Sequence, residues 1–191
     1  MIEYIKGDLV KSDCDVIIHG CNCFCNMGAG IAKQIRETYP EAYETDKLTT
    51  RGDKNKLGQI SYTRVVNKYF PDKVVYVVNA YTQFTYGRKD GEIYADYIAI
   101  REAMVRINEL FSDTHDVQFK IGLPKIGAGL ARGDWNIISK TIDEVFGDRK
   151  IYVYEWDNGE VKKEEFDLKK LKEEWKKHLD TIYKADNEKN I

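Results

Sequence analysis

The chain has 191 residues, a length that suits one domain with an additional terminal segment. Its hydrophobic share of 42% is enough for a buried core, and 30 Lys and Arg residues nearly balance 32 Asp and Glu residues. The net charge of −2 argues against a nucleic acid partner. The sequence has no apolar run long enough to span a bilayer and no secretory signal, so we expect a cytoplasmic protein without membrane contact.

Hydrophobic patterning divides most of the chain into strands and helices. It predicts strands over residues 2–6, 15–19, 59–66, 73–79, 117–123 and 150–156, and helices over residues 31–39, 41–50, 94–111 and 134–146. Pro40 is expected to interrupt the helical structure between the first two helices. A short turn at Pro71 and Asp72 makes the strands on either side of it an antiparallel hairpin, so the sheet is mixed.

Two segments outside these elements have a distinct composition. Residues 79–87 are polar and aromatic and run into the glycine-containing segment 88–91, which predicts a flexible loop able to close over a ligand. Residues 166–183 carry apolar side chains at three- and four-residue steps, which predicts an amphipathic helix. We therefore expect a domain at residues 1–156 and a C-terminal extension at residues 157–191, whose helix packs on the domain.

The four cysteines, Cys14, Cys21, Cys23 and Cys25, lie close together in the sequence. Residues two apart on a strand point the same way but rarely satisfy disulfide geometry. A zinc site usually brings paired ligands from separated segments, and the chain has no second cluster. We therefore expect four reduced thiols and no metal site.

Two segments of similar design stand out. The apolar run at residues 16–18 leads through a polar turn into Gly28 and Gly30 and then a helix, and a second strand leads into Gly127 and Gly129 and another helix. A strand, glycine loop and helix in this order aim backbone N–H groups at an anion. Two such loops at the carboxyl ends of two strands can hold the two phosphates of a pyrophosphate from opposite sides.

Four motifs in the same order resemble the macro domain, a family that binds ADP-ribose. They are Gly-Asp-Leu at residues 7–9, Asn22 at the end of the second strand, residues 27–32, and residues 124–130. The resemblance covers about residues 1–156 and implies a three-layer α/β/α sandwich on a mixed, mostly parallel sheet.

The run Ile-His-Gly-Cys-Asn-Cys at residues 18–23 is most similar to the small stand-alone members of the ADP-ribose 1″-phosphate phosphatase type, found in yeast, bacteria and phages. That resemblance implies binding of ADP-ribose and hydrolysis of the phosphomonoester of ADP-ribose 1″-phosphate, without a cofactor. Two alternatives stay open: a non-catalytic ADP-ribose-binding module, and an ADP-ribosyl hydrolase that acts on modified macromolecules.

The resemblance also implies roles for individual residues. Asp8 accepts the exocyclic amine of adenine, or else only caps a turn. Asn22 binds ribose hydroxyls, or else only occupies a left-handed turn. Trp156 stacks on adenine, or else is a core or rim residue. The remaining expected ligand-binding residues are Leu9, Gly28, Ala29, Gly30, Ile31, Asn79, Gln83, Gly127, Ala128, Gly129, Leu130 and Ala131, with Tyr86 as a further candidate near the distal ribose.

His19, three residues before Asn22, is the expected catalytic residue, with Asn22 positioning the distal ribose. A phosphomonoester hydrolase without a metal needs a group that transfers protons, and the usual pKa of histidine near 6.5 makes both of its forms available. The alternative is a histidine packed at the strand end and hydrogen-bonded to a neighbour.

Departures from the family narrow the expected chemistry. One branch that removes ADP-ribose from proteins has Gly-Val-Asp in the first loop, where this chain has Gly30-Ile31-Ala32. Another branch uses a Lys after the central strand and an Asp in the second loop, where this chain has Asn79 or Ala80, and Ala131. Cleavage of aspartyl or glutamyl ADP-ribose esters is therefore disfavoured, which leaves phosphatase activity or binding alone.

Overall fold

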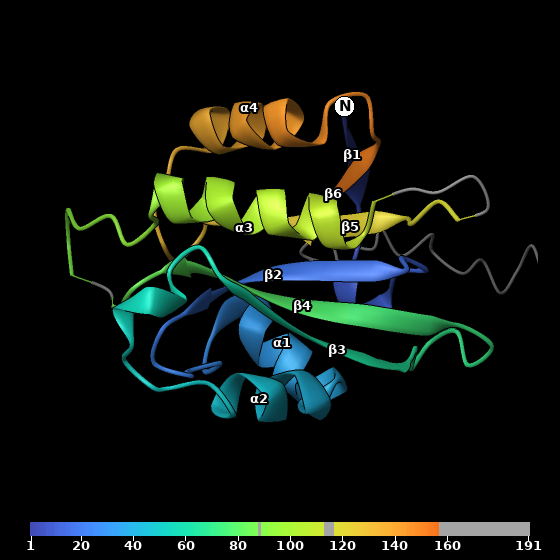
Figure 1. Ribbon diagram of the computed structural model, residues 1–191, viewed down its shortest axis with the longest axis horizontal. Helices are drawn as coiled ribbons and strands as arrows, with labels where there is room; N and C mark the ends of the chain where they lie inside the picture. The colour runs from blue at the N-terminus through green and yellow to red at the C-terminus, as the bar shows by residue number, and fades with distance from the viewer. Residues whose placement is uncertain (88, 113–116, 157–191) are drawn as a thin grey trace, which may run out of the picture. The chain divides into compact units, whose positions relative to one another are not determined.

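A six-stranded sheet forms the centre of the computed structural model, which describes residues 1–87, 89–112 and 117–156 (Figure 1). The strands are β1 (Ile2–Lys6), β2 (Val16–Asn22), β3 (Ile60–Val66), β4 (Val74–Gln83), β5 (Ile121–Pro124) and β6 (Ile151–Glu155). Their order in the sheet is β1-β6-β5-β2-β4-β3, and every neighbouring pair is parallel except the β3–β4 hairpin. The expectation of a mixed, mostly parallel sheet is confirmed.

Helices cover both faces of this sheet. The helices α1 (Gly30–Thr38) and α2 (Pro40–Lys47) lie on one face, and α3 (Tyr97–Leu110) and α4 (Trp135–Phe146) on the other (Figure 1). Two short 3₁₀ turns, η1 (Leu9–Lys11) and η2 (Lys54–Lys56), lie in the connections. The structure is therefore the expected three-layer α/β/α sandwich.

The alternation of side chains along β2 assigns its residues to two separate cores. Val16 and Ile18 are fully buried in the core under α3 and α4, whereas Ile17 is buried in the core that includes residues of α1 and α2. A strand covered on both faces reads as a continuous apolar run, as this one does. The same alternation decides which later residues of β2 reach the site.

Several element boundaries differ from those expected. The two helices separate at Tyr39, as expected, and Pro40 is the first residue of α2, where the missing N–H costs no hydrogen bond. β2 continues to Asn22, and β4 continues to Gln83, so residues 79–83 are strand rather than loop. The helix expected at residues 166–183 and Arg88 lie outside the described residues, so the division of the chain at residue 156 stays a prediction.

The described residues contain no helix that is long and apolar enough to cross a membrane. The four cysteines are free thiols; Cys14, Cys21 and Cys23 are buried and Cys25 is half-buried. Within the described part of the chain, no group of three or more His, Cys, Asp or Glu side chains is arranged to hold a metal ion.

Candidate ligand-binding groove

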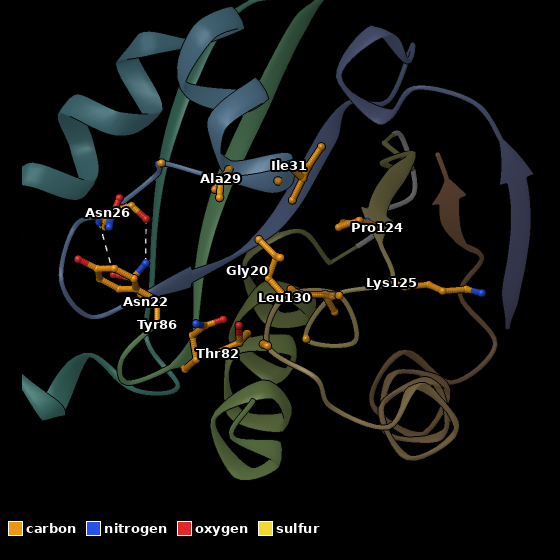
Figure 2. A pocket seen from close by; sticks show the side chains of 18 of the residues that line it. Gly20, Asn22, Asn26, Ala29, Ile31, Thr82, Tyr86, Pro124, Lys125 and Leu130 are labelled. Atoms are coloured by element: carbon orange, nitrogen blue, oxygen red, sulfur yellow. Dashed lines mark hydrogen bonds between the residues drawn. The ribbon is translucent and has the colours of Figure 1, made fainter. Parts of the chain in front are cut away.

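A groove crosses the carboxyl ends of β2, β4 and β5 between two loops (Figure 2). We call residues 23–29 the first glycine loop and residues 125–134 the second. The deeper part of the groove has a volume of about 500 Å³, and an adjoining part of about 530 Å³ extends toward β1 and β6. The two parts share Gly30, Ile31, Pro124 and Lys125, so they form one continuous site.

The two ends of the groove differ in chemistry. The end near β4, here called the polar end, is lined by Asn22, Asn26, Thr82, Gln83 and Tyr86. The end near β1 and β6, here called the aromatic end, is lined by Gly7, Leu9, Gln34, Tyr154, Glu155 and Trp156. Backbone from the two glycine loops lies between these ends. A ligand that spans the groove therefore meets two different recognition surfaces.

Asn22 holds the first glycine loop in shape at the polar end. Its Nδ2 donates to the Asn26 carbonyl at 2.8 Å, and its Oδ1 accepts from the backbone N–H of Asn26 at 3.4 Å (Figure 2). The same Oδ1 also accepts from the backbone N–H of Phe24 at 2.9 Å. Among the described contacts this leaves one Nδ2–H group unused. Asn22 therefore both shapes the loop and has a donor for a ligand.

The start of α1 supplies unpaired backbone donors to the middle of the groove. Ala29, the N-cap residue, makes no side-chain capping hydrogen bond, and the first turn has no acidic residue. Gly30 and Ile31, at the first helical positions, line the groove. Because the first N–H groups of a helix have no partner within it, and the helix dipole is positive there, this end of α1 favours an anion.

The second glycine loop faces the start of α1 across the groove. Gly127 has φ +73°, and a Cβ there would lie 2.9 Å from Ile100, so this position requires glycine. A Cβ at Gly129 would meet no atom within 4 Å, so its backbone is open to the groove. Leu130 and Ala131 also line the site. Ala128 lines neither part and packs against the core instead.

The aromatic end contains the residues expected to meet adenine. Trp156 lines the groove and is 54% exposed, which leaves its ring available for stacking. Leu9 also lines this end but is buried. Asp8 accepts the backbone N–H of Val10 at 3.0 Å, so it caps η1 in the way that the alternative interpretation described. Its contact with adenine stays a prediction.

His19 and Asn79 do not reach the groove. Both are fully buried, and His19 Nε2 lies 2.7 Å from Asn79 Oδ1. Asn79 Nδ2 donates to the Ala42 carbonyl of α2 at 2.9 Å and to Ser61 Oγ at 3.0 Å, so Asn79 Oδ1 is the acceptor and His19 Nε2 carries the proton. The position of His19 does not support proton transfer to a ligand, and that of Asn79 does not support ribose binding.

Strand alternation explains this difference from the sequence-based expectation. Residues three apart on a strand point to opposite faces, so His19 points away from the side of β2 that Gly20 and Asn22 present to the groove. Burial lowers the pKa of His19 to about 4, against smaller opposing effects of its hydrogen bond to Asn79 and the charge of Asp46. His19 is therefore neutral at pH 7.

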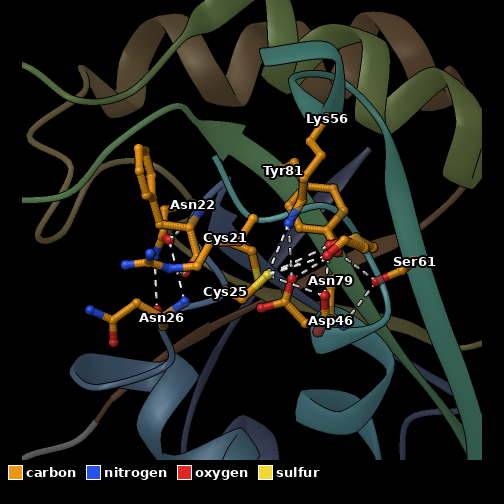
Figure 3. Close-up of polar contacts among 12 residues, drawn as sticks. Cys21, Asn22, Cys25, Asn26, Asp46, Lys56, Ser61, Asn79 and Tyr81 are labelled. Atoms are coloured by element: carbon orange, nitrogen blue, oxygen red, sulfur yellow. Dashed lines mark hydrogen bonds and ion pairs between the residues drawn. The ribbon is translucent and has the colours of Figure 1, made fainter. Parts of the chain in front are cut away.

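A buried polar network lies beside His19 (Figure 3). Lys56 Nζ lies 3.3 Å from Asp46 Oδ1 and 3.3 Å from Cys25 Sγ, and the Tyr81 hydroxyl donates to Asp46 Oδ1 at 2.9 Å. Burial raises the pKa of Tyr81 and is the largest cause of the raised pKa of Cys21. Through Cys25 the network connects α2 and η2 to the first glycine loop.

Sequence reasoning missed part of the lining. Besides the residues expected, the groove is lined by Gly7, Gly20, Asn26, Ala32, Gln34, Thr82, Gly87, Pro124, Lys125, Ile126, Tyr154 and Glu155. The signal that could have found Gly20 is its place two residues before Asn22, on the same face of β2. Among the described lining residues of the polar end, no side chain is a His, Asp or Glu.

Several known proteins are similar to this chain, including the following three. An uncharacterized 17.5 kDa protein of enterobacteria phage T4 is 38% identical over 160 residues, which cover 82% of this chain and 97% of the phage protein. The ADP-ribose 1″-phosphate phosphatase of Meyerozyma guilliermondii is 26% identical over 155 residues, covering 70% and 87% of the two chains. The macrodomain of Thermus aquaticus DarG matches the fold with a TM-score of 0.59 at 22% identity, over 81% of this chain and 98% of that domain. No protein-family model matches the chain.

Proposed function

Because this chain belongs to the macro domain family, we propose that its groove binds ADP-ribose with the diphosphate between the two glycine loops. The observation that carries the proposal is the uncapped start of α1, which faces the open backbone at Gly129 across the groove. Backbone N–H groups converging from two sides suit a diphosphate. The adenosine then lies at the aromatic end beside Trp156, and the distal ribose lies at the polar end.

We further propose that the protein hydrolyses ADP-ribose 1″-phosphate to ADP-ribose and phosphate, as the names of its relatives support. Water attacks the phosphorus while the bond from phosphorus to the 1″ oxygen breaks, and that oxygen leaves on the ribose. The polar end offers amide and hydroxyl groups rather than an acid–base pair, so positioning and hydrogen bonding to the phosphate account for the rate.

A second function has one observation in its favour. Because no His, Asp or Glu among the described residues lines the polar end, the groove is also suited to binding without turnover. The protein would then be a binding module for ADP-ribose or for ADP-ribosylated macromolecules. Its four free thiols fit the reducing cytoplasm, where we expect either function to operate.

Calorimetry with ADP-ribose, ADP and AMP tests the binding proposal. We expect ADP-ribose to bind most tightly, because it alone fills both ends of the groove. Equal affinity for ADP and ADP-ribose would contradict this assignment. In parallel, phosphate release from ADP-ribose 1″-phosphate separates the two functions: tight binding of ADP-ribose without phosphate release supports the binding module.

Gly129 provides a matched pair of variants for the same assay. A Cβ at this position meets no atom within 4 Å, so Gly129→Ala should keep both the fold and the affinity. The larger side chain of Gly129→Leu should occupy the space between the loops and lower the affinity for ADP-ribose by at least about tenfold, without lowering the urea midpoint. Unchanged affinity of Gly129→Leu would place the diphosphate elsewhere.

A further inference from the structure

Thr82 occupies a β-bulge at the polar end of the groove. In the pairing of β2 with β4, Cys21 lies opposite Tyr81 and Asn22 lies opposite Gln83, which leaves Thr82 without a partner residue on β2. The Thr82 carbonyl accepts the backbone N–H of Asp96 at 2.9 Å. Bulges occur next to binding sites, where they re-aim a side chain. Thr82 lies at this bulge on the face of β4 opposite that of Tyr81 and lines the groove, as Figure 2 shows.

The hydroxyl of Thr82 has no hydrogen-bond partner among the residues that the structure describes. The residue is only 1% exposed, and it lines the groove beside Asn22 and Gln83. A buried hydroxyl without a partner destabilises the folded protein, because it gives up its hydrogen bonds to water. Such a group therefore indicates a partner that arrives with a ligand.

Gly20 makes room for this hydroxyl. A Cβ at Gly20 would lie 2.8 Å from Thr82 Oγ1, which is closer than real Cβ atoms approach another heavy atom. It would also lie 3.2 Å from Ile126 Cγ1, which is a tight contact. The φ of Gly20 is not in the left-handed region, so the backbone itself does not require glycine there. Space for Thr82 and Ile126 is thus the reason for glycine at this position.

We propose that Thr82 is a specificity-determining residue that hydrogen-bonds a hydroxyl of the distal sugar, an inference that rests on the proposed function. The lining at this end also carries the neutral amides of Asn22, Asn26 and Gln83. A sugar hydroxyl both donates and accepts a hydrogen bond, as a threonine hydroxyl does. Lys125, the cationic side chain among the described lining residues, forms an ion pair with Glu155 of the aromatic end.

Three variants test this role. Thr82→Val keeps the shape of the side chain and removes the hydroxyl, and Thr82→Ser keeps the hydroxyl and removes the methyl group. Thr63→Val makes the same change as Thr82→Val on β3, where Thr63 pairs with Val77 away from the groove. Each variant is titrated with ADP-ribose and with ADP, and its unfolding in urea is measured without ligand.

We expect Thr82→Val to bind ADP-ribose about 3- to 10-fold more weakly and ADP within about twofold of wild type, because ADP lacks the distal sugar. Thr82→Ser and Thr63→Val should retain the affinity for ADP-ribose within about threefold. The urea midpoint of Thr82→Val should equal or exceed that of wild type, since the variant removes an unpartnered polar group. Thr82→Val should therefore lose affinity for ADP-ribose without losing stability in urea.

Three results would overturn the proposal. If Thr82→Val binds ADP-ribose like wild type, the hydroxyl does not contact the ligand. If it loses affinity for ADP and ADP-ribose equally, the hydroxyl does not distinguish the sugar. If it unfolds at lower urea than wild type, the hydroxyl already has a partner in the free protein. A wild-type protein that binds no ADP-ribose would instead refute the proposed function, and this inference with it.

Discussion

Replacing His19 with glutamine tests whether the histidine is a buried structural residue. Burial lowers the pKa of His19 to about 4, while an exposed histidine in the unfolded chain titrates near 6.5. Between these values the unfolded state binds a proton that the folded state does not. The free energy of unfolding therefore falls as the pH falls from about 6.5 to about 4, and His19 contributes its full stabilisation above about 6.5.

The size of the effect follows from the shift. A difference of about 2.5 pKa units corresponds to about 3 kcal/mol of stability lost across this pH range. The groups around the imidazole are Asn79, the Cys21 thiol and the more distant charge of Asp46, and burial outweighs the attraction of that charge. Glutamine does not titrate, and its Nε2 can replace the histidine donor to Asn79 Oδ1.

Urea unfolding of wild type and His19→Gln at half-unit steps from pH 4 to pH 8 measures this contribution. The advantage of wild type over the variant should be greatest above pH 6.5 and decrease by about 3 kcal/mol toward pH 4. Other titrating groups affect both proteins and cancel in the difference. Parallel pH profiles, or an imidazole that titrates near pH 6.5 by NMR, would refute the burial of His19 and restore it as a catalytic candidate.

The remaining predictions concern turnover, the buried ion pair and the fit of Gly20. His19→Gln should not show the roughly 10²- to 10⁴-fold loss of phosphate release that removal of a general acid–base residue causes. Lys56→Met should lower the free energy of unfolding, measured in urea, by about 3–5 kcal/mol, because it leaves the Asp46 carboxylate buried without its cation. The double variant Lys56→Met/Asp46→Asn should recover part of this loss. Gly20→Ala should weaken ADP-ribose binding by displacing the Thr82 hydroxyl, and calorimetry of the double variant Gly20→Ala/Thr82→Val should show less than the sum of the two losses.

The layers of the fold and the middle of the groove could be predicted because their signals are local. An apolar run followed within a few residues by glycines and a helix requires no knowledge of the rest of the chain, and Gly28, Gly30 and Gly129 lie where that pattern indicated. The resemblance to the macro domain motifs predicted the three-layer arrangement. Both the glycine-loop pattern and these motifs consist of residues that are neighbours in the sequence.

The end of β4 could not be predicted in this way. Asn79 is a residue type that is depleted in strands, and it begins the polar and aromatic segment 79–87, so the strand was expected to end there. In the structure Asn79 Nδ2 donates hydrogen bonds to the Ala42 carbonyl and to Ser61 Oγ, which are 37 and 18 residues away in the sequence. Partners supplied by distant segments keep a polar residue inside a strand, and the local pattern does not reveal them.

On the paired strands β2 and β4, the residues that stabilise the fold lie on one face and the residues that line the groove lie on the other. On β2 and β4, His19, Asn79 and Tyr81 point into the buried network, whereas Gly20 and Thr82 point into the groove. Because the side-chain period of a strand is two, adjacent residues in the sequence have different tasks. Substitutions on the network face should therefore change the free energy of unfolding at nearly constant ligand affinity. Substitutions on the groove face should change ligand affinity at nearly constant free energy of unfolding. Thr82 differs from this pattern, because its unpartnered hydroxyl destabilises the free protein and, in our proposal, binds the ligand in the complex.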